Sequence, residues 1–363
     1  RLKHTLVDQT LHVQDVAGCT GESGVIGFGP AGVQPLRIRG GLQGIGGVQV
    51  RIIAHVGMLS PLCFGRKGLE HGRVAGHLWQ MDKTLLSFGH GYSARALAAL
   101  LIPQGWRVIG TTRSTEKADE IAATGVEPLI WPGSDVMPVL SQATHVLVSA
   151  GPSAEGDPVL NALHDAIAAK ASALDWLGYL STTGVYGDHN GDWVDEDTPL
   201  SPTTKRGQMR KSAEEAWRAI PDLPLHIFRL AGIYGPGRGP FEKVRQGTAR
   251  RIIKQGQVFS RTHVEDIAQV LAASIERPAP GTAYNVCDDD PAPPQEVIAH
   301  AATLLGLPVP PAIPIEQAEM TPMARSFYAE SKRVRNERIK QALGVRLRYP
   351  TYREGLAALL KDG

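Results

Sequence analysis

The chain has 363 residues, and its 38 lysines and arginines against 36 aspartates and glutamates give a net charge of +2 at pH 7. A balance this close to zero argues against nucleic acid or an anionic membrane surface as a partner. Three cysteines argue against a disulfide framework, and no apolar run approaches the roughly 18–20 residues that a membrane-spanning helix needs. The composition therefore predicts a soluble, cytoplasmic protein.

The first 80 residues differ from the remainder. They contain four acidic residues (Asp8, Asp15, Glu22 and Glu70), no tyrosine, and glycine-rich stretches without helical or strand periodicity. Met81 stands three residues before the first predicted strand. We expect residues 1–80 to be an extension, non-native or disordered, rather than a folded domain; a genuine but poorly ordered leader is the alternative.

Strand and helix patterns alternate from Met81 onward. The predicted strands are 84–88, 106–112, 126–131, 145–149, 173–181 and 225–230. The predicted helices are 93–101, 115–123, 158–170, 212–220, 264–275, 296–305 and 331–343. Such alternation predicts an α/β protein with a Rossmann-type doubly wound parallel sheet. We expect residues 81–230 to form a nucleotide-binding domain, and residues 231–363 to form a smaller substrate-binding region interleaved with it.

A glycine turn joins the first predicted strand to the first helix, with the residues Gly89, His90, Gly91, Tyr92, Ser93 and Ala94. Gly89 permits a sharp turn, Gly91 allows the backbone to approach a pyrophosphate, and Ala94 allows close packing of helix on strand. The helix start adds N–H groups and the positive end of a dipole. The turn predicts a dinucleotide site; the alternative is a purely structural glycine turn.

The end of the second predicted strand indicates which dinucleotide binds. NAD-binding sites of this type place a carboxylate about 20 residues past the glycines. Here the strand ends in Thr112, Arg113 and Ser114, and a guanidinium suits a 2′-phosphate. We therefore expect NADP rather than NAD, although Arg113 could also be a solvated residue. Arg95 is either a second phosphate contact or a surface residue.

Five segments carry a resemblance to one family: the glycine turn and residues 181–187, 228–237, 263–266 and 284–288. From Met81 onward the chain resembles the extended short-chain dehydrogenase/reductases, the NAD(P)-dependent epimerase/dehydratase group, and within it the atypical branch. The resemblance implies an oxidoreductase or epimerase-like enzyme that acts on a hydroxyl or carbonyl carbon of a small molecule. A sugar nucleotide is one candidate substrate, and a homodimer is one candidate assembly. Ala150 and Gly151, after the fourth strand, are expected to border the cofactor.

The family's chemistry uses a Ser or Thr, a Tyr, and a Lys four residues after the Tyr. Matching the segment 181–187 places Thr182 at the hydroxyl position, and Lys211 follows at the family spacing. The residue four before Lys211 is Gly207, which has no phenol that could exchange a proton. Lys211 could instead be a solvated helix residue, and Thr182 could cap local backbone.

Three explanations for Gly207 stay open. Tyr186 or Tyr234 supplies the proton, Thr182 works with an ordered water, or the protein binds the cofactor as a non-catalytic redox sensor. Tyr186 could also be a wall residue beside the nicotinamide. A gain of reductase turnover in Gly207→Tyr would support an altered enzyme site.

Several polar residues are weaker candidates. Asp157 is a site carboxylate or the N-cap of the helix 158–170, and Arg261 could contact a substrate phosphate. His263 and Asp266 predict a structural pair and not a metal site. The basic run 332–335 is expected to be a solvated helix end.

Overall fold

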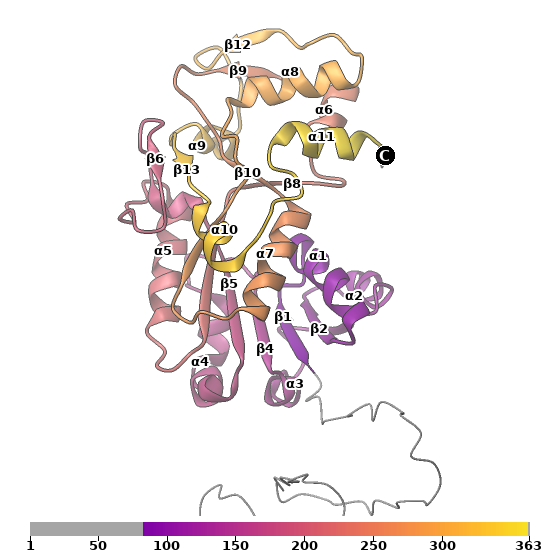
Figure 1. Ribbon diagram of the computed structural model, residues 1–363, viewed down its shortest axis with the longest axis vertical. Coiled ribbons are helices and arrows are strands. Elements are labelled where there is room, and N and C mark those ends of the chain that lie inside the picture. Colours follow the sequence, from indigo (N-terminus) through magenta and orange to yellow (C-terminus); the bar gives the residue numbers. More distant parts are fainter. Residues whose placement is uncertain (1–82, 362–363) are drawn as a thin grey trace, which may run out of the picture. The chain divides into compact units, whose positions relative to one another are not determined.

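The computed structural model describes residues 83–361, so the expectations for residues 1–80 lie outside the described residues. Its centre is one parallel sheet with the strands β1 (Thr84–Phe88), β2 (Arg107–Thr112), β3 (Glu127–Ile130), β4 (His145–Val148), β5 (Trp176–Thr182), β7 (Leu225–Leu230) and β11 (Ala283–Val286). The spatial order is β11-β7-β5-β4-β1-β2-β3 (Figure 1). From β1 the chain winds outward to β3, then returns beside β1 and winds the other way. The switch point therefore lies between β1 and β4, where folds of this kind bind ligands beyond the carboxyl ends of the strands.

The strands are apolar because both faces of the sheet are covered. Every residue of β1 and of β4 is buried. A strand buried on both faces needs a nearly continuous apolar run rather than alternation. The predicted Rossmann-type doubly wound sheet is thereby confirmed.

Two helical layers enclose the sheet. One face packs on α3 (Met137–Gln142), α4 (Pro158–Lys170) and α5 (Lys205–Arg218). The other face packs on α1 (Tyr92–Leu101), α2 (Thr115–Ala122), α7 (Val264–Glu276) and α10 (Glu337–Leu343). Because β11, α7 and α10 come from the C-terminal part of the chain, that part contributes to the sheet layers as well.

A smaller region lies beyond the carboxyl ends of β7 and β11, at the upper end of the molecule in Figure 1. It contains α6 (Phe241–Arg245), α8 (Pro294–Leu304), α9 (Pro322–Phe327) and α11 (Tyr352–Lys361). Its three two-stranded pairs are β8 (Gly232–Tyr234) with β10 (Arg261–His263), β9 (Arg251–Ile253) with β12 (Ala312–Pro314), and β6 (Trp193–Val194) with β13 (Arg333–Val334). Tyr234, Phe241, Tyr352 and Leu356 belong to its own apolar core.

The strand 225–230 and the helix 158–170 match the prediction at both ends, whereas the helix predicted over 331–343 is wrong in its first half. Residues 333–334 form β13, and the helix begins only at Glu337. Lys332 is 9% exposed, and its ammonium donates to Glu330 Oε2 (2.9 Å) and to the Gly187 carbonyl. The basic run is therefore not a solvated helix end, because strand pairing with β6 draws Lys332 into the interior.

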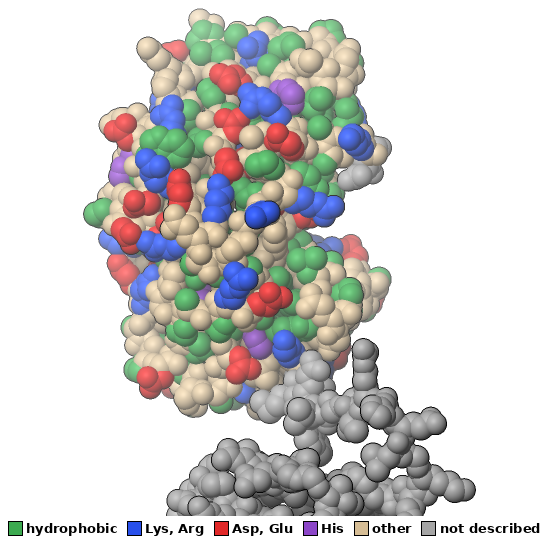
Figure 2. All heavy atoms as spheres, viewed as in Figure 1, with side chains coloured by type: hydrophobic (Ala, Val, Ile, Leu, Met, Phe, Trp, Pro, Cys, Tyr) green, Lys and Arg blue, Asp and Glu red, His purple; other side chains and the backbone are tan. Residues whose placement is uncertain are grey.

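The surface carries both signs of charge. Figure 2 shows lysines and arginines interspersed with aspartates and glutamates over the face in view. None of the helices within residues 83–361 combines the length and apolar character needed to cross a membrane.

Candidate functional site

The glycine turn between β1 and α1 lies directly against the end of β4. Gly89 has a φ of 73°, and a Cβ there would lie 2.9 Å from the amide nitrogen of Ala150. The turn is fixed from β2, because the Gly89 amide donates to Thr111 Oγ1 (2.8 Å) and the His90 amide donates to the Thr111 carbonyl (2.9 Å). Left-handed backbone and this close approach together require glycine at position 89.

Gly91 opens α1 and leaves free space above the helix start. It caps the helix without a side chain, and the one neighbour that a Cβ there would meet is the Gly89 carbonyl oxygen, at 3.6 Å. Ser93 and Ala94 are buried in the first turn, and the Tyr92 hydroxyl donates to the Pro236 carbonyl (2.9 Å). The amides of a first helical turn have no intrahelical acceptor, so this cradle fits a pyrophosphate.

The end of β2 presents one exposed cation. Ser114 caps α2 by accepting from the Lys117 amide (3.3 Å), and its own amide donates to Thr112 Oγ1 (3.2 Å). Arg113, between the two, is exposed. Arg95 instead pairs with Glu120 on α2 at 3.2 Å. Of the two arginines singled out in the sequence, Arg113 is thus the one left available at the end of β2.

The hydroxyl of Thr182 lies at the carboxyl end of β5. Thr182 Oγ1 accepts a hydrogen bond from the Gly184 amide (3.2 Å) and caps the short helix η3 (Thr183–Tyr186). A hydroxyl has one donor and two acceptor positions, so accepting this bond leaves its O–H proton available. Thr182 therefore caps local backbone and can still donate to a substrate oxygen.

The phenol of Tyr186 is enclosed in the protein core. It is fully buried, its hydroxyl donates to Asn285 Oδ1 (2.7 Å), and it accepts from Arg229 Nη1 (2.9 Å). Burial raises the pKa of its phenol to about 12, despite the opposing charge of Arg229. Tyr186, one of the predicted proton donors, is thus a core residue. Its hydroxyl is hydrogen-bonded to the buried Arg229 and to Asn285.

That arginine belongs to an ion pair that the sequence analysis missed. Arg229 Nη2 lies 2.9 Å from Glu214 Oε2, and both side chains are at most 5% exposed. Ser181 also donates to Glu214. The available signal was a glutamate on the buried face of a helix opposite an arginine in a fully buried strand.

Neighbouring chain packs directly against Gly207 and leaves no room for a side chain. A Cβ at this position would lie 2.6 Å from the Gly184 carbonyl oxygen and 2.7 Å from Pro202 Cβ. The first turn of α5 thus packs directly on η3. The missing tyrosine is therefore not an empty slot, because backbone fills the space where its side chain would begin.

One turn further along α5, the structure separates two neighbouring cations. Lys211 has a side chain that is 37% exposed and pairs with Glu215 at 3.9 Å. Arg210, which the sequence analysis did not single out, donates from Nη1 to the Leu180 carbonyl (2.7 Å) and to the Tyr179 hydroxyl (3.1 Å). Its Nη2 lies 3.1 Å from the position of a Cβ on Gly151. Arg210, rather than Lys211, therefore reaches the ends of β4 and β5.

Tyr234 packs against His263 and lies against Gly355 of α11. Burial and the charges of nearby carboxylates raise the pKa of Tyr234, whose ring packs edge-on against His263 at 5.2 Å. Asp266 accepts from the amides of Arg348 (2.7 Å) and Tyr349 (3.2 Å), so it holds a loop. Tyr234 is therefore a core residue, and within the described residues its buried hydroxyl has no hydrogen-bond partner.

Two further candidates make local contacts. Asp157 Oδ1 accepts from the amides of Val159 (2.9 Å) and Leu160 (3.1 Å), so Asp157 is the N-cap of α4. Arg261 Nη1 donates to the carbonyls of Phe259 (2.8 Å) and Ala292 (3.0 Å). No group of three or more possible metal ligands occurs in the described part of the chain.

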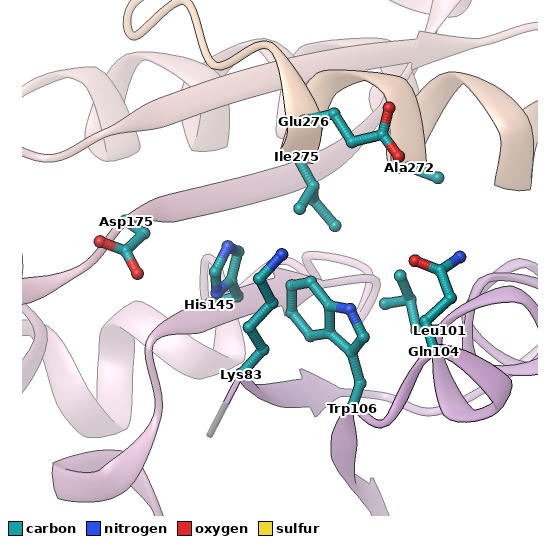
Figure 3. Close-up of a pocket in the computed structure, with 9 residues that line it drawn as sticks. All are labelled: Lys83, Leu101, Gln104, Trp106, His145, Asp175, Ala272, Ile275 and Glu276. Carbon is teal, nitrogen blue, oxygen red and sulfur yellow. The ribbon is translucent and has the colours of Figure 1, made fainter. Parts of the chain in front are cut away.

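A hollow of about 240 Å³ lies at the opposite edge of the sheet (Figure 3). Lys83, Trp106, His145 and Asp175 stand at or just before the amino ends of four strands, and Glu276 ends α7. Open α/β sheets bind ligands at the carboxyl edge. This hollow is therefore not the nucleotide site.

The chain is similar to known proteins in sequence and in structure. No family model matches the chain. A solved structure of a functionally unknown conserved protein from Silicibacter pomeroyi is 64% identical, with a TM-score of 0.74 over 77% of this chain and 99% of that one. Protein YeeZ of Escherichia coli is 29% identical over 242 residues, which are 63% of this chain and 86% of YeeZ.

A candidate NAD-dependent epimerase/dehydratase from Methylobacillus flagellatus is 26% identical, with a TM-score of 0.57 over 78% of this chain and 98% of that one. The similarity supports the extended short-chain dehydrogenase/reductase family. The resemblance carried by the glycine turn and the four later segments is thereby confirmed.

Two more distant structures share the fold of this chain. A human epimerase family protein with NADPH is 19% identical, with a TM-score of 0.60. MoeE5, in complex with UDP-glucose and NAD, is 19% identical, also with a TM-score of 0.60. Each is matched over 77% of this chain.

Proposed function

We propose that this protein is an NADP-dependent oxidoreductase or epimerase-like enzyme that acts on a hydroxyl or carbonyl carbon of a small molecule. The observation that carries the proposal is the cradle at Gly89 and Gly91, where close backbone approach and open space coincide at the switch point. Structurally similar proteins hold NAD or NADPH, which supports a nicotinamide cofactor. When bound, such a cofactor supplies or accepts a hydride.

Residues at the carboxyl ends of β1, β2, β4 and β5 would bind the cofactor and the substrate. The amides of Tyr92, Ser93 and Ala94 would face the pyrophosphate, and Arg113 beside Thr112 and Ser114 would bind the 2′-phosphate. The main chain of Ala150 and Gly151 would border the nicotinamide ribose. Thr182 would donate its hydroxyl proton to the substrate oxygen.

Sugar nucleotides are one candidate substrate class, because MoeE5 holds UDP-glucose. Arg261 gives this class no support, since its Nη1 is bound to two main-chain carbonyls. The substrate pocket would instead lie between Thr182, the start of α5 and α9.

The second candidate function is a non-catalytic NADP-binding redox sensor. Two observations favour it: the Gly184 main chain occupies the space beside Gly207, and the phenols of Tyr186 and Tyr234 are buried. The hydroxyl of Tyr186 is bonded to Asn285 and Arg229, and Tyr234 is buried, which supports a site without a proton-donating phenol. A panel of aldehydes and ketones, assayed with NADPH, separates the functions, because turnover that is lost in Thr182→Ala requires an enzyme.

Arg113→Ala tests the choice of cofactor. A charge-assisted hydrogen bond contributes about 1.5–3 kcal/mol, so we expect NADPH to bind about 10–100-fold more weakly and NADH to be unaffected. Lys117→Ala is the matched control, since Lys117 is an exposed cation in the first turn of α2. Equal losses for NADPH and NADH in Arg113→Ala would overturn the role of Arg113.

A further inference from the structure

We infer that Arg210 binds an anion in the crevice at the carboxyl ends of β4 and β5, and that the substrate carries a carboxylate which binds there. The inference rests on the proposed function, because it names the chemical class of the substrate for the same crevice. It depends on the side chain of one arginine, on the charge around it, and on the position of α9.

The guanidinium of Arg210 is anchored along one edge only. Nη1 is fixed by the Leu180 carbonyl (2.7 Å) and the Tyr179 hydroxyl (3.1 Å), and the group lies over the Tyr179 ring at 5.6 Å. Within residues 83–361, all hydrogen bonds of this guanidinium come from Nη1. The Nε–Nη2 edge is left over, and such an edge matches the two oxygens of a carboxylate.

Two arginines, Arg206 and Arg210, lie in the first two turns of α5. Arg206, one turn before Arg210, contacts the ring of Phe327 at 5.9 Å, and neither arginine has a carboxylate within ion-pair distance in the part of the chain that the structure describes. Of the neighbouring carboxylates, Glu214 pairs with Arg229 at 2.9 Å, and Asp157 caps α4 through Oδ1 while its Oδ2 is buried without a hydrogen-bond partner within residues 83–361. An anion at the free edge of Arg210 would form the ion pair that this arginine lacks among the described residues.

The position favours the substrate over the cofactor as the source of that anion. The phosphates of a dinucleotide would lie at the glycine turn and at Arg113, whereas Arg210 is held by the Leu180 carbonyl of β5 and lies against Gly151, one residue past the Ala150 that Gly89 approaches. The ribose and the reduced ring at the nicotinamide end are uncharged, and the oxidised ring is a cation. A guanidinium stays protonated in proteins, so it would repel the oxidised ring unless an anion lay nearby.

Helix α9 indicates what the carboxylate is attached to. Phe327 is 53% exposed and Met323 is 67% exposed, and Phe327 stands beside Arg206 at the start of α5. Large exposed apolar side chains next to a cation fit a ligand with both an acidic and an apolar part. An aryl carboxylate is therefore the appropriate probe.

The test uses the full chain and begins with NADPH binding to the wild type, because failure at that step refutes the proposed function itself. The NADPH-loaded protein is then titrated with benzoate and with uncharged benzamide by calorimetry. We expect benzoate to bind at least about tenfold more tightly than benzamide. Equal affinity, or no binding of either probe, would overturn the inference without using any variant.

Two substitutions then locate the binding group. Arg210→Gln should weaken benzoate at least about tenfold while changing NADPH affinity less than about threefold, and Arg210→Lys should recover only part of the benzoate affinity, because it lacks the fork. Lys211→Gln removes the competing cation and should leave benzoate binding intact. A loss of benzoate binding in Lys211→Gln, or a loss of NADPH binding equal to that of benzoate in Arg210→Gln, would overturn the assignment.

Discussion

The main chain of α5 comes so close to η3 at Gly207 that a larger residue has no room. The Cβ of an introduced side chain would stand 2.6 Å from the Gly184 carbonyl oxygen. Ordinary contacts between these atom types begin at about 3.3 Å, so the overlap is about 0.7 Å, and main chain rather than a flexible side chain has to move. We therefore expect Gly207→Tyr to disrupt the packing of α5 on η3 and to produce no reductase turnover.

The magnitude follows from two opposing effects in Gly207→Ala. Overpacking costs about 1–3 kcal/mol, and the better helix propensity of alanine returns about 1 kcal/mol. The expected net loss in the free energy of unfolding is about 0–2 kcal/mol, which is a fall of at most a few degrees in Tm. Gly207→Tyr should lose more, about 3 kcal/mol, because it gains less propensity and must place a ring.

Urea unfolding of both variants, followed by circular dichroism, measures these losses. Ser212→Ala is the matched control, because Ser212 is exposed in the same helix and its change should be neutral or slightly stabilising. A Gly207→Tyr protein as stable as the wild type, with new NADPH-dependent turnover, would refute the reasoning and show that a tyrosine fits the site.

Three other predictions concern buried polar groups. Tyr186→Phe removes a hydroxyl bonded on both sides, so the free energy of unfolding should fall by about 1–3 kcal/mol, with NADPH affinity unchanged; a stability equal to the wild type in urea would contradict this. Glu214→Ala leaves an arginine buried without its partner and should cost about 3–5 kcal/mol, whereas exposed Glu215→Ala should cost almost nothing; similar urea midpoints for the two would contradict the buried pair. Burial lowers the pKa of three histidines from 6.5 to about 4: His90, His145 and His226. Below pH 6.5 the unfolded chain binds protons that the folded protein does not, so the urea midpoint should fall between pH 7 and pH 5, and a constant midpoint would contradict their burial as neutral groups.

The sheet was predictable because its strands carry a strong local signal. Strand 225–230 is apolar enough to be buried on both faces, and Pro158 after Asp157 marks the start of α4. The glycine turn was predictable for the same reason, since Gly89 needs a left-handed backbone whatever the surroundings. These features depend on residues close together in the chain.

The site was less predictable, because its decisive contacts join distant segments. Lys211 was favoured on residue type and spacing, yet Arg210 is the residue that meets Gly151, 59 positions earlier. Tyr186 was a reasonable proton donor until Arg229 and Asn285 were found around its hydroxyl. A family motif indicates where a side chain begins but not which partner binds its far end.

The cradle at Gly91 offers the most direct test of the central claim that the glycine turn binds a nicotinamide nucleotide. A Cβ at Gly91 meets only the Gly89 carbonyl oxygen, at 3.6 Å, so Gly91→Ala should fold with a stability loss of no more than about 1 kcal/mol. The added methyl would occupy the space of the pyrophosphate. In a fluorescence titration of the full chain with NADPH, we predict saturable binding to the wild type and at least about tenfold weaker binding to Gly91→Ala. Absence of NADPH and NADH binding to the folded wild type, or equal binding by the variant, would contradict the account and leave the glycine turn as architecture alone.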